Sequence, residues 1–300
     1  MFRKRLNINK IKNLVGDTPL VKVSDKIYAK LESVNPGGSI KDRPVKWIID
    51  NAEKNNLLKQ NDTIIEATSG NTGIALAMIG AERGYNVKIV MPNDMSAERK
   101  VLLKMFGAEL IEVGEGDFEQ AITLKDEIVE EKGYFSLNQF NNPLNVECHY
   151  KTTFKELLNH SLTIGKYISA FISGTGTGGT IMGVQKGFAE FDTRVKMIAV
   201  EPAESPVMSG GEKGLHGIQG IGDGSQFLVE LDKIDDILTV STEDAKKRCK
   251  ELALHNGLLV GISAGANILA SERWVEKNNP SGIVFTILCD RGERYSSMLY

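Results

Sequence analysis

Ile168-Ser-Ala-Phe-Ile-Ser-Gly174 runs directly into Thr175-Gly-Thr-Gly-Gly-Thr180, and this stretch decides the fold. Its first part has the apolar, β-branched and aromatic residues of a buried strand. Its second part is a glycine-rich turn that opens a helix, where backbone N–H groups and threonine hydroxyls can surround a phosphate. A strand that passes through such a turn into a helix is the unit from which parallel α/β sheets are built.

The same alternation continues over most of the chain. We expect further strands at 63–66, 87–91, 109–113, 195–200 and 282–288, and helices at 73–82, 96–106, 117–131, 242–256 and 264–278. Strands separated by amphipathic helices predict βαβ units and mainly parallel, twisted sheets. At 300 residues the chain has about the length of two domains. We therefore predict an α/β fold with two such sheets.

Composition and charge exclude several classes of protein. Apolar residues make up 41% and charged residues 25%, which is typical of a globular chain. A net charge of −3, without a dense basic face, argues against binding to nucleic acid or to an anionic membrane. No apolar run approaches the roughly 18 residues of a membrane-spanning helix. The three scattered cysteines, Cys148, Cys249 and Cys289, fit a cytoplasmic protein without a metal site.

Three other turns carry polar residues at the expected start of a helix. Thr68-Ser-Gly-Asn-Thr-Gly73 offers hydroxyls and free amides suited to a carboxylate, although Ser, Thr and Asn are also ordinary helix caps. Lys41 follows the turn Pro36-Gly-Gly-Ser39, where the helix dipole favours a neutral amine able to form a Schiff base. Without its neighbours, Lys41 would read as a solvated surface lysine. Ser263 opens a later helix and alone is most simply an N-cap.

The ligand of the glycine-rich turn has two interpretations. Gly174, Gly176 and Gly179 satisfy G-x-G-x-x-G, and Glu201 ends the next strand about 20 residues further on, as a dinucleotide site requires. On this stretch alone an NAD-dependent oxidoreductase is therefore a legitimate hypothesis. The other hypothesis is a smaller phosphate-bearing cofactor.

Taken together, the motifs resemble the cysteine synthase (O-acetylserine sulfhydrylase) and cystathionine β-synthase family of pyridoxal-phosphate enzymes. The resemblance rests on Ser39-Ile-Lys-Asp-Arg43, Thr68-Ser-Gly-Asn-Thr-Gly73 and Gly176-Thr-Gly-Gly-Thr180. It extends in the right order through residues 16–21, 91–92, 139–143, 149–153, 201–202, 205–211, 217–222, 263–265 and 292–295. Because it covers essentially the whole chain, it disfavours the NAD hypothesis.

The resemblance implies a role for each motif. Lys41 corresponds to the lysine that binds pyridoxal phosphate and later acts as the base for the substrate α-proton. Asn71 matches the residue that bonds the phenolic oxygen of the cofactor, and Ser263 matches the partner of its pyridine nitrogen. The phosphate would be held by Gly174, Thr175, Gly176, Thr177, Gly178, Gly179 and Thr180. The substrate would be held by Thr68, Ser69, Gly70, Thr72, Gln139 and Gly220.

The resemblance also implies an organisation and a reaction. The fold would be type II, as in the tryptophan synthase β chain, with two three-layer α/β/α domains. Residues 40–145 would form the smaller, mobile domain, and residues 1–39 with 146–300 the larger, cofactor-binding one. The chain would form a homodimer, while no residue supports a complex with a serine acetyltransferase. The reaction would be β-replacement or β-elimination on cysteine or an O-activated serine through an aminoacrylate intermediate.

The chain departs from the family pattern at three places. Gly220-Ile-Gly-Asp-Gly-Ser-Gln-Phe227 replaces a largely apolar loop, which adds Asp223, with Asp232 a few residues further on. Phe154-Lys155 replaces Gly-Pro, and Cys289-Asp-Arg291 replaces a stretch of proline and serines. A carboxylate near the reacting carbon could act as a general base toward water, unless both aspartates face solvent. We therefore keep two hypotheses, a cysteine synthase and a cysteine-consuming lyase that releases sulfide, with Asp223 and Asp232 as candidate catalytic residues of the second.

Overall fold

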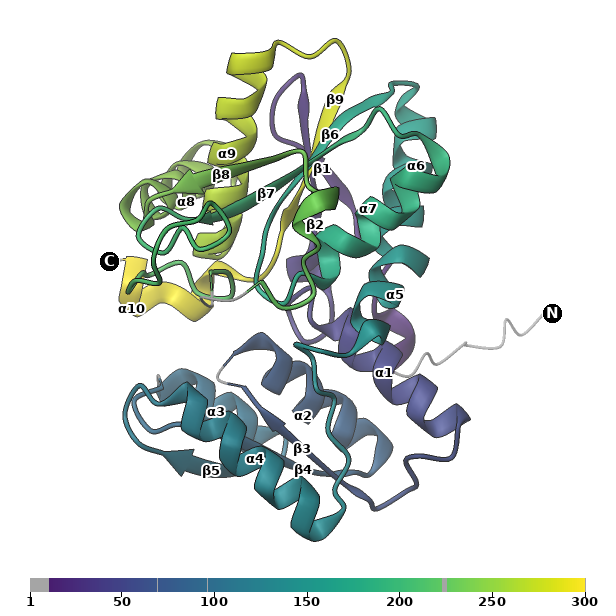
Figure 1. Cartoon of the computed structure of the whole chain (residues 1–300), viewed down its shortest axis with the longest axis vertical. Helices are drawn as coiled ribbons and strands as arrows, with labels where there is room; N and C mark the ends of the chain where they lie inside the picture. The colour runs from purple at the N-terminus through teal and green to yellow at the C-terminus, as the bar shows by residue number, and fades with distance from the viewer. Residues whose placement is uncertain (1–10, 69, 96, 223–225, 300) are drawn as a thin grey trace, which may run out of the picture.

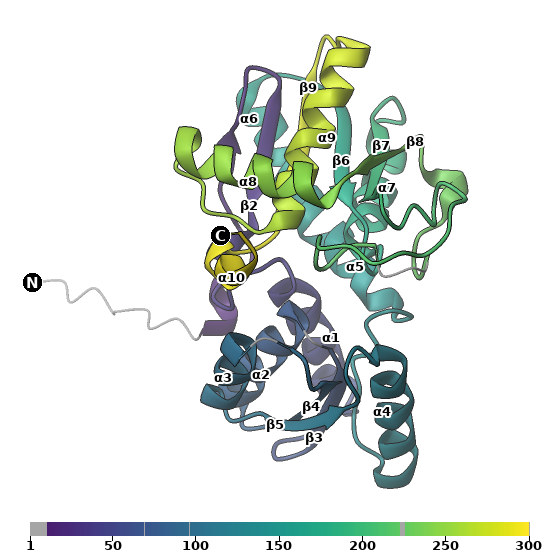
Figure 2. The same ribbon diagram turned by 90° about the vertical axis from the view of Figure 1, so that its left-hand side faces the viewer.

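The chain folds into two lobes, each built around its own sheet (Figure 1). The computed structural model describes residues 11–68, 70–95, 97–222 and 226–299. The upper lobe of Figure 1 contains a six-stranded sheet and the lower lobe a three-stranded sheet. In the view turned by 90°, the two lobes again lie one above the other, with helices on both sides of each sheet (Figure 2).

The six-stranded sheet has the order β1-β2-β9-β6-β7-β8. Its strands are β1 (Leu20–Lys22), β2 (Ile27–Leu31), β6 (Ile168–Gly174), β7 (Lys196–Pro202), β8 (Asp236–Val240) and β9 (Ile283–Leu288). All neighbours are parallel except β1, which pairs antiparallel with β2. Every residue of β9 is buried, as expected for a central strand covered on both faces.

Helices cover both faces of this sheet. On one face lie α5 (Pro143–Lys151), α6 (Thr153–Ile164) and α7 (Gly179–Phe191), whose Phe188 packs with strand residues such as Phe171 and Phe285. On the other face lie α8 (Thr242–Asn256) and α9 (Ile262–Asn278). The short elements η1 (Ile11–Leu14), η2 (Glu32–Val34), η3 (Leu231–Lys233), η4 (Gly292–Tyr295) and α10 (Ser296–Leu299) complete the lobe.

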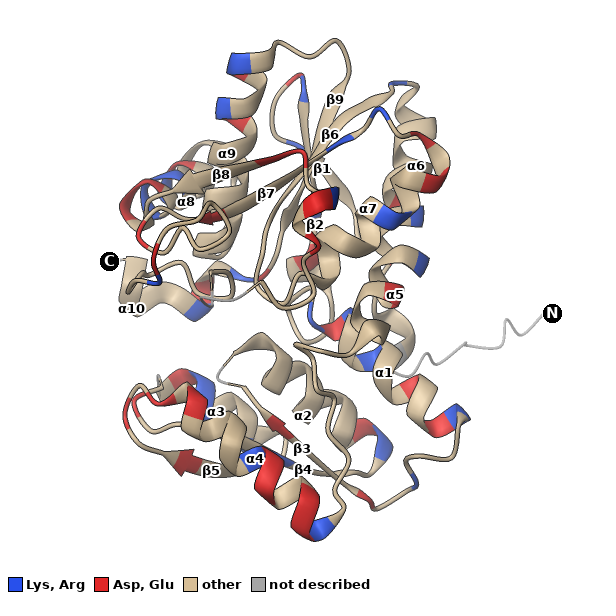
Figure 3. Ribbon diagram, in the orientation of Figure 1, with Lys and Arg blue, Asp and Glu red and all other residues tan. Residues whose placement is uncertain are grey.

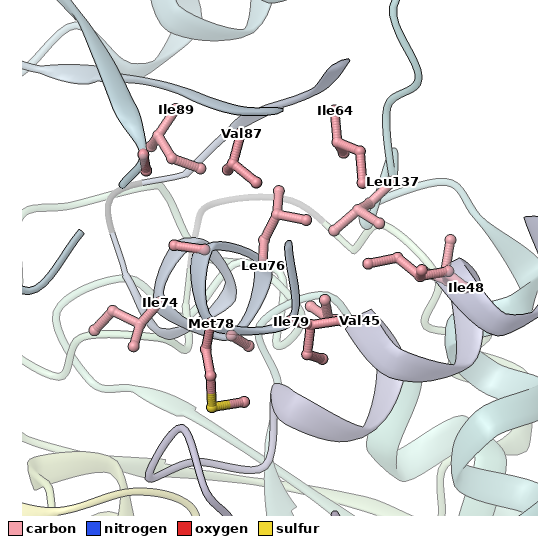
Figure 4. Close-up of a cluster of buried hydrophobic side chains, with 14 of the residues drawn as sticks. Val45, Ile48, Ile64, Ile74, Leu76, Met78, Ile79, Val87, Ile89 and Leu137 are labelled. Atoms are coloured by element: carbon pink, nitrogen blue, oxygen red, sulfur yellow. The ribbon is translucent and has the colours of Figure 1, made fainter. Parts of the chain in front are cut away.

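The three-stranded sheet is parallel, with the order β3-β4-β5. Its elements are α1 (Asp42–Lys54), β3 (Thr63–Ala67), α2 (Asn71–Arg83), β4 (Asn86–Pro92), α3 (Ala97–Met105), β5 (Glu109–Val113) and α4 (Phe118–Lys132). On one face, Ile64 and Ile89 pack against Leu76 of α2 and Ile48 of α1 (Figure 4). On the other face, Ile65 and its neighbours pack against α4. Both lobes are thus three-layer α/β/α structures, which confirms the predicted fold class.

Local sequence sets the helix boundaries. Asp117 and Ser241 cap α4 and α8 by accepting hydrogen bonds from the N–H groups of Gln120 (2.8 Å) and Asp244 (3.1 Å). The helices α2, α4, α6 and α8 each end at a left-handed glycine, namely Gly84, Gly133, Gly165 and Gly257. For this reason the predicted helices at 73–82, 117–131, 242–256 and 264–278 agree with the observed ones within two residues. The sequence predicts no bounds for strands β1, β2 and β8 or for helices α1, α5, α6 and α7.

Charges of both signs are distributed over the two lobes (Figure 3). Within the described ranges, no helix is both long and apolar enough to span a membrane. The same part of the chain holds no group of three or more His, Cys, Asp or Glu side chains arranged for a metal ion.

A buried ion network anchors the start of α1 in the upper lobe. The Arg43 guanidinium donates to both carboxylate oxygens of Glu32 at 2.7 and 2.8 Å, and to both oxygens of Glu156 at 2.6 and 2.7 Å. Lys30 bonds Glu156 and the backbone oxygen of Thr18. The planar guanidinium of Arg43 thus binds two carboxylates, each through two hydrogen bonds, and Lys30 adds a second positive charge. The network joins β2, η2, α1 and α6.

Replacing Arg43 with methionine should destabilise the chain strongly. Glu32 is fully buried and would lose its main counter-charge, a loss that typically costs about 3–5 kcal/mol. Urea unfolding of Arg43→Met measures it, with Arg194→Met as control, because the Arg194–Asp192 pair is exposed and should contribute below about 1 kcal/mol. Equal losses in the two variants would contradict an anchoring role.

The same network should make stability depend on pH. Burial alone would raise the pKa of Glu156, but hydrogen bonds and charge from Arg43 and Lys30 lower it to about 2. Folding therefore favours the ionised form, so this stability is present above the unfolded-state pKa of 4.5 and is lost as the pH falls toward 2. Urea unfolding at falling pH should show wild type approaching Glu156→Gln in stability. A constant difference for Glu156→Gln would rule the linkage out.

Candidate active site

A cavity lies where the two lobes meet, at the carboxyl ends of β6 and β9. Its volume, including the open mouth, is about 540 Å³. It is lined by Ile40, Lys41, Asn71, Ser173, Gly174, Gly176, Thr177, Gly178, Thr180, Ile181, Gln219, Gly220, Ile221, Ser263, Ile287 and Cys289. Parallel α/β sheets bind ligands at this edge. The cavity thus brings together Lys41, Asn71, the glycine-rich turn and Ser263, which the sequence places far apart.

Lys41 lies at the N-cap of α1 and is partly buried. Its backbone N–H donates to the Ser39 hydroxyl at 3.2 Å. The next residue, Asp42, is buried, and its Oδ2 accepts the Gly37 N–H at 2.5 Å. Burial raises the pKa of Asp42 to about 7, although the Gly37 N–H and the Arg294 charge act in the opposite direction. The bond from Gly37 to Asp42 and the bond from Lys41 to Ser39 therefore hold the turn that precedes Lys41.

The turn at residues 174–180 has the shape of an anion cup. Among the described residues, the backbone N–H groups of Gly176, Thr177 and Gly178 have no hydrogen-bond partner, and α7 begins directly after them. Gly178 has φ +86°, and a Cβ there would lie 2.6 Å from Val229. Free N–H groups at a helix N-terminus are what a phosphate binds. This part of the cavity fits the phosphate of pyridoxal phosphate.

The turn is held in place by its neighbours. Gly174 N–H donates to Asn267 Oδ1 at 2.6 Å, and the Thr177 hydroxyl accepts from Asn145 Nδ2 at 3.0 Å. A Cβ on Gly179 would lie 2.1 Å from Asn145 Oδ1. Sequence reasoning did not identify Asn145 or Asn267, because each acts through residues at least 32 positions away.

Asn71 is the first residue of α2, and its side chain is bonded on both sides. Its Nδ2 donates to Asp290 Oδ2 at 2.7 Å, and its Oδ1 accepts a hydrogen bond from Arg294. Asp290 is buried and also accepts from the Tyr295 hydroxyl. From the sequence, Asp290 was noted only within a departure from the family and Arg294 only within the matching residues 292–295, so both are site residues that the sequence analysis missed.

Ser263 lies in the first turn of α9 and is buried. Cys289 lines the same cavity, and the Ser263 hydroxyl acts to lower the pKa of its thiol. Burial raises the pKa of Cys289 to about 12, so the thiol stays protonated at neutral pH and is a poor nucleophile. The departure at Cys289 therefore changes the surface of the cavity without adding a reactive group.

Residues predicted to bind the substrate lie around the start of α2. The Thr72 hydroxyl donates to Gln139 Oε1 at 2.7 Å, with both residues buried. The Gly70 N–H lies 3.3 Å from the Thr68 hydroxyl, and Gly220 lines the cavity. Ser69 lies outside the described residues. The structure therefore brings Thr68, Gly70, Thr72 and Gln139 into one polar group.

Other candidates lie elsewhere. Asp232 is exposed on η3 and does not line the cavity, so the structure does not bring it to Lys41. Asp223 lies outside the described residues. Phe154, one of the departures from the family, packs in the core with its ring 5.0 Å from that of Phe188 and does not line the cavity. His149 is buried and bonds the hydroxyls of Thr153 and Thr180. Burial and the charge of Arg43 hold its pKa well below the usual value.

Glu201 does not have the role that a dinucleotide site requires. Its carboxylate is buried and accepts hydrogen bonds from the N–H groups of Met208 (2.8 Å) and Ser209 (2.9 Å). These bonds occupy both carboxylate oxygens, so the Glu201 side chain stabilises the loop that contains Met208 and Ser209. The glycine-rich turn therefore lacks the acidic partner for a ribose.

Comparison with known proteins identifies the family. Residues 11–290 match the family described as pyridoxal-phosphate dependent enzyme. A cysteine synthase from Staphylococcus aureus is 42% identical over 301 residues, which cover 97% of this chain and 96% of the relative. The crystal structure of an O-ureido-L-serine synthase is 36% identical with a TM-score of 0.92, covering 97% of this chain and 94% of that one. The crystal structure of a hydrogen sulfide-producing enzyme from Fusobacterium nucleatum is 40% identical with a TM-score of 0.89, covering 96% of this chain and 99% of that one. The chain therefore belongs to the pyridoxal-phosphate dependent enzyme family, and its cofactor is pyridoxal phosphate.

Proposed function

We propose that the chain is a cysteine synthase-like enzyme that replaces the β-substituent of an O-activated serine with sulfide. The observation that carries the proposal is the convergence of Lys41, the free N–H groups of 176–178 and Ser263 on one cavity. A lysine amine, a phosphate cup and a hydroxyl for the ring nitrogen are the three contacts that pyridoxal phosphate needs here. The 42% identity to a cysteine synthase supports this reaction class.

Each cofactor contact has a physical reason in this proposal. Lys41 would bind the cofactor covalently and, once displaced by the substrate amine, would move the α-proton. Pyridoxal phosphate, when bound, withdraws electrons from the substrate α-carbon. Ser263 would offer the ring nitrogen a hydroxyl, which would not hold that nitrogen protonated as a carboxylate would. A weaker electron sink favours loss of a β-leaving group over a long-lived negative charge at the α-carbon.

The substrate carboxylate binds at the start of α2. The N–H groups of a helix N-terminus attract an anion, and α2 has no acidic residue in its first turn. Thr72 and Gln139 add polar atoms next to that terminus. Thr68 and Gly70 complete the group, and Gly220 of the opposite lobe lines the cavity together with Asn71 of α2.

A cysteine-consuming lyase is the second candidate function. The similarity to a hydrogen sulfide-producing enzyme favours it. Of the two acidic side chains expected to activate water, Asp232 is exposed and away from the cavity, which weakens this candidate function, and Asp223 lies outside the described residues. Among the described residues, the observations therefore support a cysteine synthase better than a cysteine-consuming lyase.

The proposal includes the organisation of the protein. Residues 40–145 would form a mobile domain that closes over the substrate, against a larger domain of residues 1–39 and 146–300. Two chains would form a homodimer in the cytoplasm. Free cysteines at 148, 249 and 289 support a reducing compartment.

Lys41→Ala should lower the rate of cysteine formation from O-acetylserine and sulfide by about 10³-fold or more, since proton transfer and covalent binding are both lost. Mass spectrometry after borohydride reduction should find the cofactor on the Lys41 peptide in wild type and on no lysine in the variant. Lys46→Ala, in the same helix, is the control and should retain the wild-type rate. Activity that persists in a folded Lys41→Ala protein would remove Lys41 from this role.

Incubation of the cofactor-loaded enzyme with cysteine alone separates the two candidate functions. We expect sulfide release and serine formation to be slower than cysteine formation from O-acetylserine, and Asp232→Asn to leave both rates unchanged. Sulfide release as fast as the forward reaction would identify a lyase. A loss of sulfide release in Asp232→Asn would give that carboxylate a catalytic role despite its exposure.

A further inference from the structure

The side chain of Asn71 is held between two charged residues of the C-terminal segment. Asp290 accepts its Nδ2 hydrogen bond at 2.7 Å, and Arg294 donates to its Oδ1. Both partners are more than 200 positions from Asn71 in the sequence. Asn71 also lines the cavity beside Lys41.

These two partners determine the orientation of the amide. An ionised carboxylate can only accept hydrogen bonds, and a guanidinium can only donate them. A flipped Asn71 would place its NH₂ against Arg294 and its oxygen against Asp290, which loses both bonds. The observed orientation uses the oxygen and one N–H and leaves the second N–H of Asn71 for a further acceptor.

The partners are themselves held in place. The Tyr295 hydroxyl donates to the same Asp290 oxygen, and Arg294 also donates to the backbone oxygen of Gly37, in the turn before Lys41. Burial raises the pKa of Asp290, while bonds from Tyr295 and Asn71 and the charge of Arg294 act against it. Arg294 donates at any pH, so it holds the orientation even where Asp290 takes up a proton.

We propose that Asp290 and Arg294 are positioning residues that keep the second N–H of Asn71 available to the ring oxygen of the cofactor. The proposal rests on the function proposed above. An N–H directed at that oxygen favours its ionised form. Asp290, within the stretch that replaces the usual proline and serines, and Arg294, which follows it, thus act through Asn71, without contact with the substrate.

Arg294→Met tests the proposal, with Arg291→Met as the matched control. Arg291 lies in the same segment and carries the same charge, but it is exposed and donates to the Ser33 carbonyl at 2.9 Å. Titration of each cofactor-free protein with pyridoxal phosphate gives the affinity, and thermal unfolding without cofactor gives the stability. We expect Arg294→Met to bind the cofactor about fivefold more weakly than Arg291→Met, the value of one hydrogen bond. At fixed pH its visible absorption should also contain more of the form protonated at the ring oxygen.

A purely structural role gives a different result. It would lower the unfolding temperature of Arg294→Met and leave affinity and absorption equal to those of Arg291→Met, which would overturn the proposal. If Arg294→Met does not fold, Arg294→Gln replaces it, because an amide can present either group to Asn71 and releases the orientation without emptying the site.

Asp290 provides the conservative pair. Asp290→Asn keeps an acceptor oxygen for Asn71 and should retain the wild-type absorption, whereas Asp290→Leu removes it and should shift the absorption as Arg294→Met does. Identical spectra for the two Asp290 variants would contradict the proposal. Wild type that takes up no cofactor would instead refute the proposed function, so the two failures are distinct.

Discussion

Four helices begin at the walls of one cavity, and the rest of the structure depends on that convergence. Lys41 caps α1, Asn71 opens α2, Gly178 caps α7 and Ser263 lies in the first turn of α9. Each helix N-terminus carries unpaired N–H groups and a partial positive charge. Bringing four of them together is unfavourable without an anion and favourable with one. A phosphate and a carboxylate on neighbouring termini provide that charge.

The two lobes are joined by ionic hydrogen bonds on either side of this cavity. The Glu32–Arg43–Glu156 network fixes the first turn of α1 to the upper lobe, two residues after Lys41. On the other side, Asp290 and Arg294 reach from the end of β9 to the first residue of α2. The lysine and the asparagine are thus located by buried ionic groups, where a change of about 1 Å in position would matter for chemistry.

Much of this could be predicted from the sequence, because the informative signals are local. The run 168–180 contains its own strand, turn and helix start, and Gly174, Gly178 and Gly179 lie where a Cβ would collide with neighbouring residues. The long-range contacts could not be predicted. Nothing near Asn71 indicates Asp290, and nothing near Phe154 indicates that it fills a space against Gly187, where a Cβ would lie 2.2 Å from its ring. The antiparallel β1–β2 pair was missed because its strands are short, and Asp232 was selected by its proximity in sequence to the cavity loop.

A crystal structure of the chain with pyridoxal phosphate bound would show which of the two glycine turns holds the phosphate. We expect the phosphate within hydrogen-bond distance of the N–H groups of Gly176, Thr177 and Gly178, with Lys41 Nζ covalently attached to the cofactor. A phosphate bound at Gly70–Asn71, or a cofactor joined to another lysine, would contradict it.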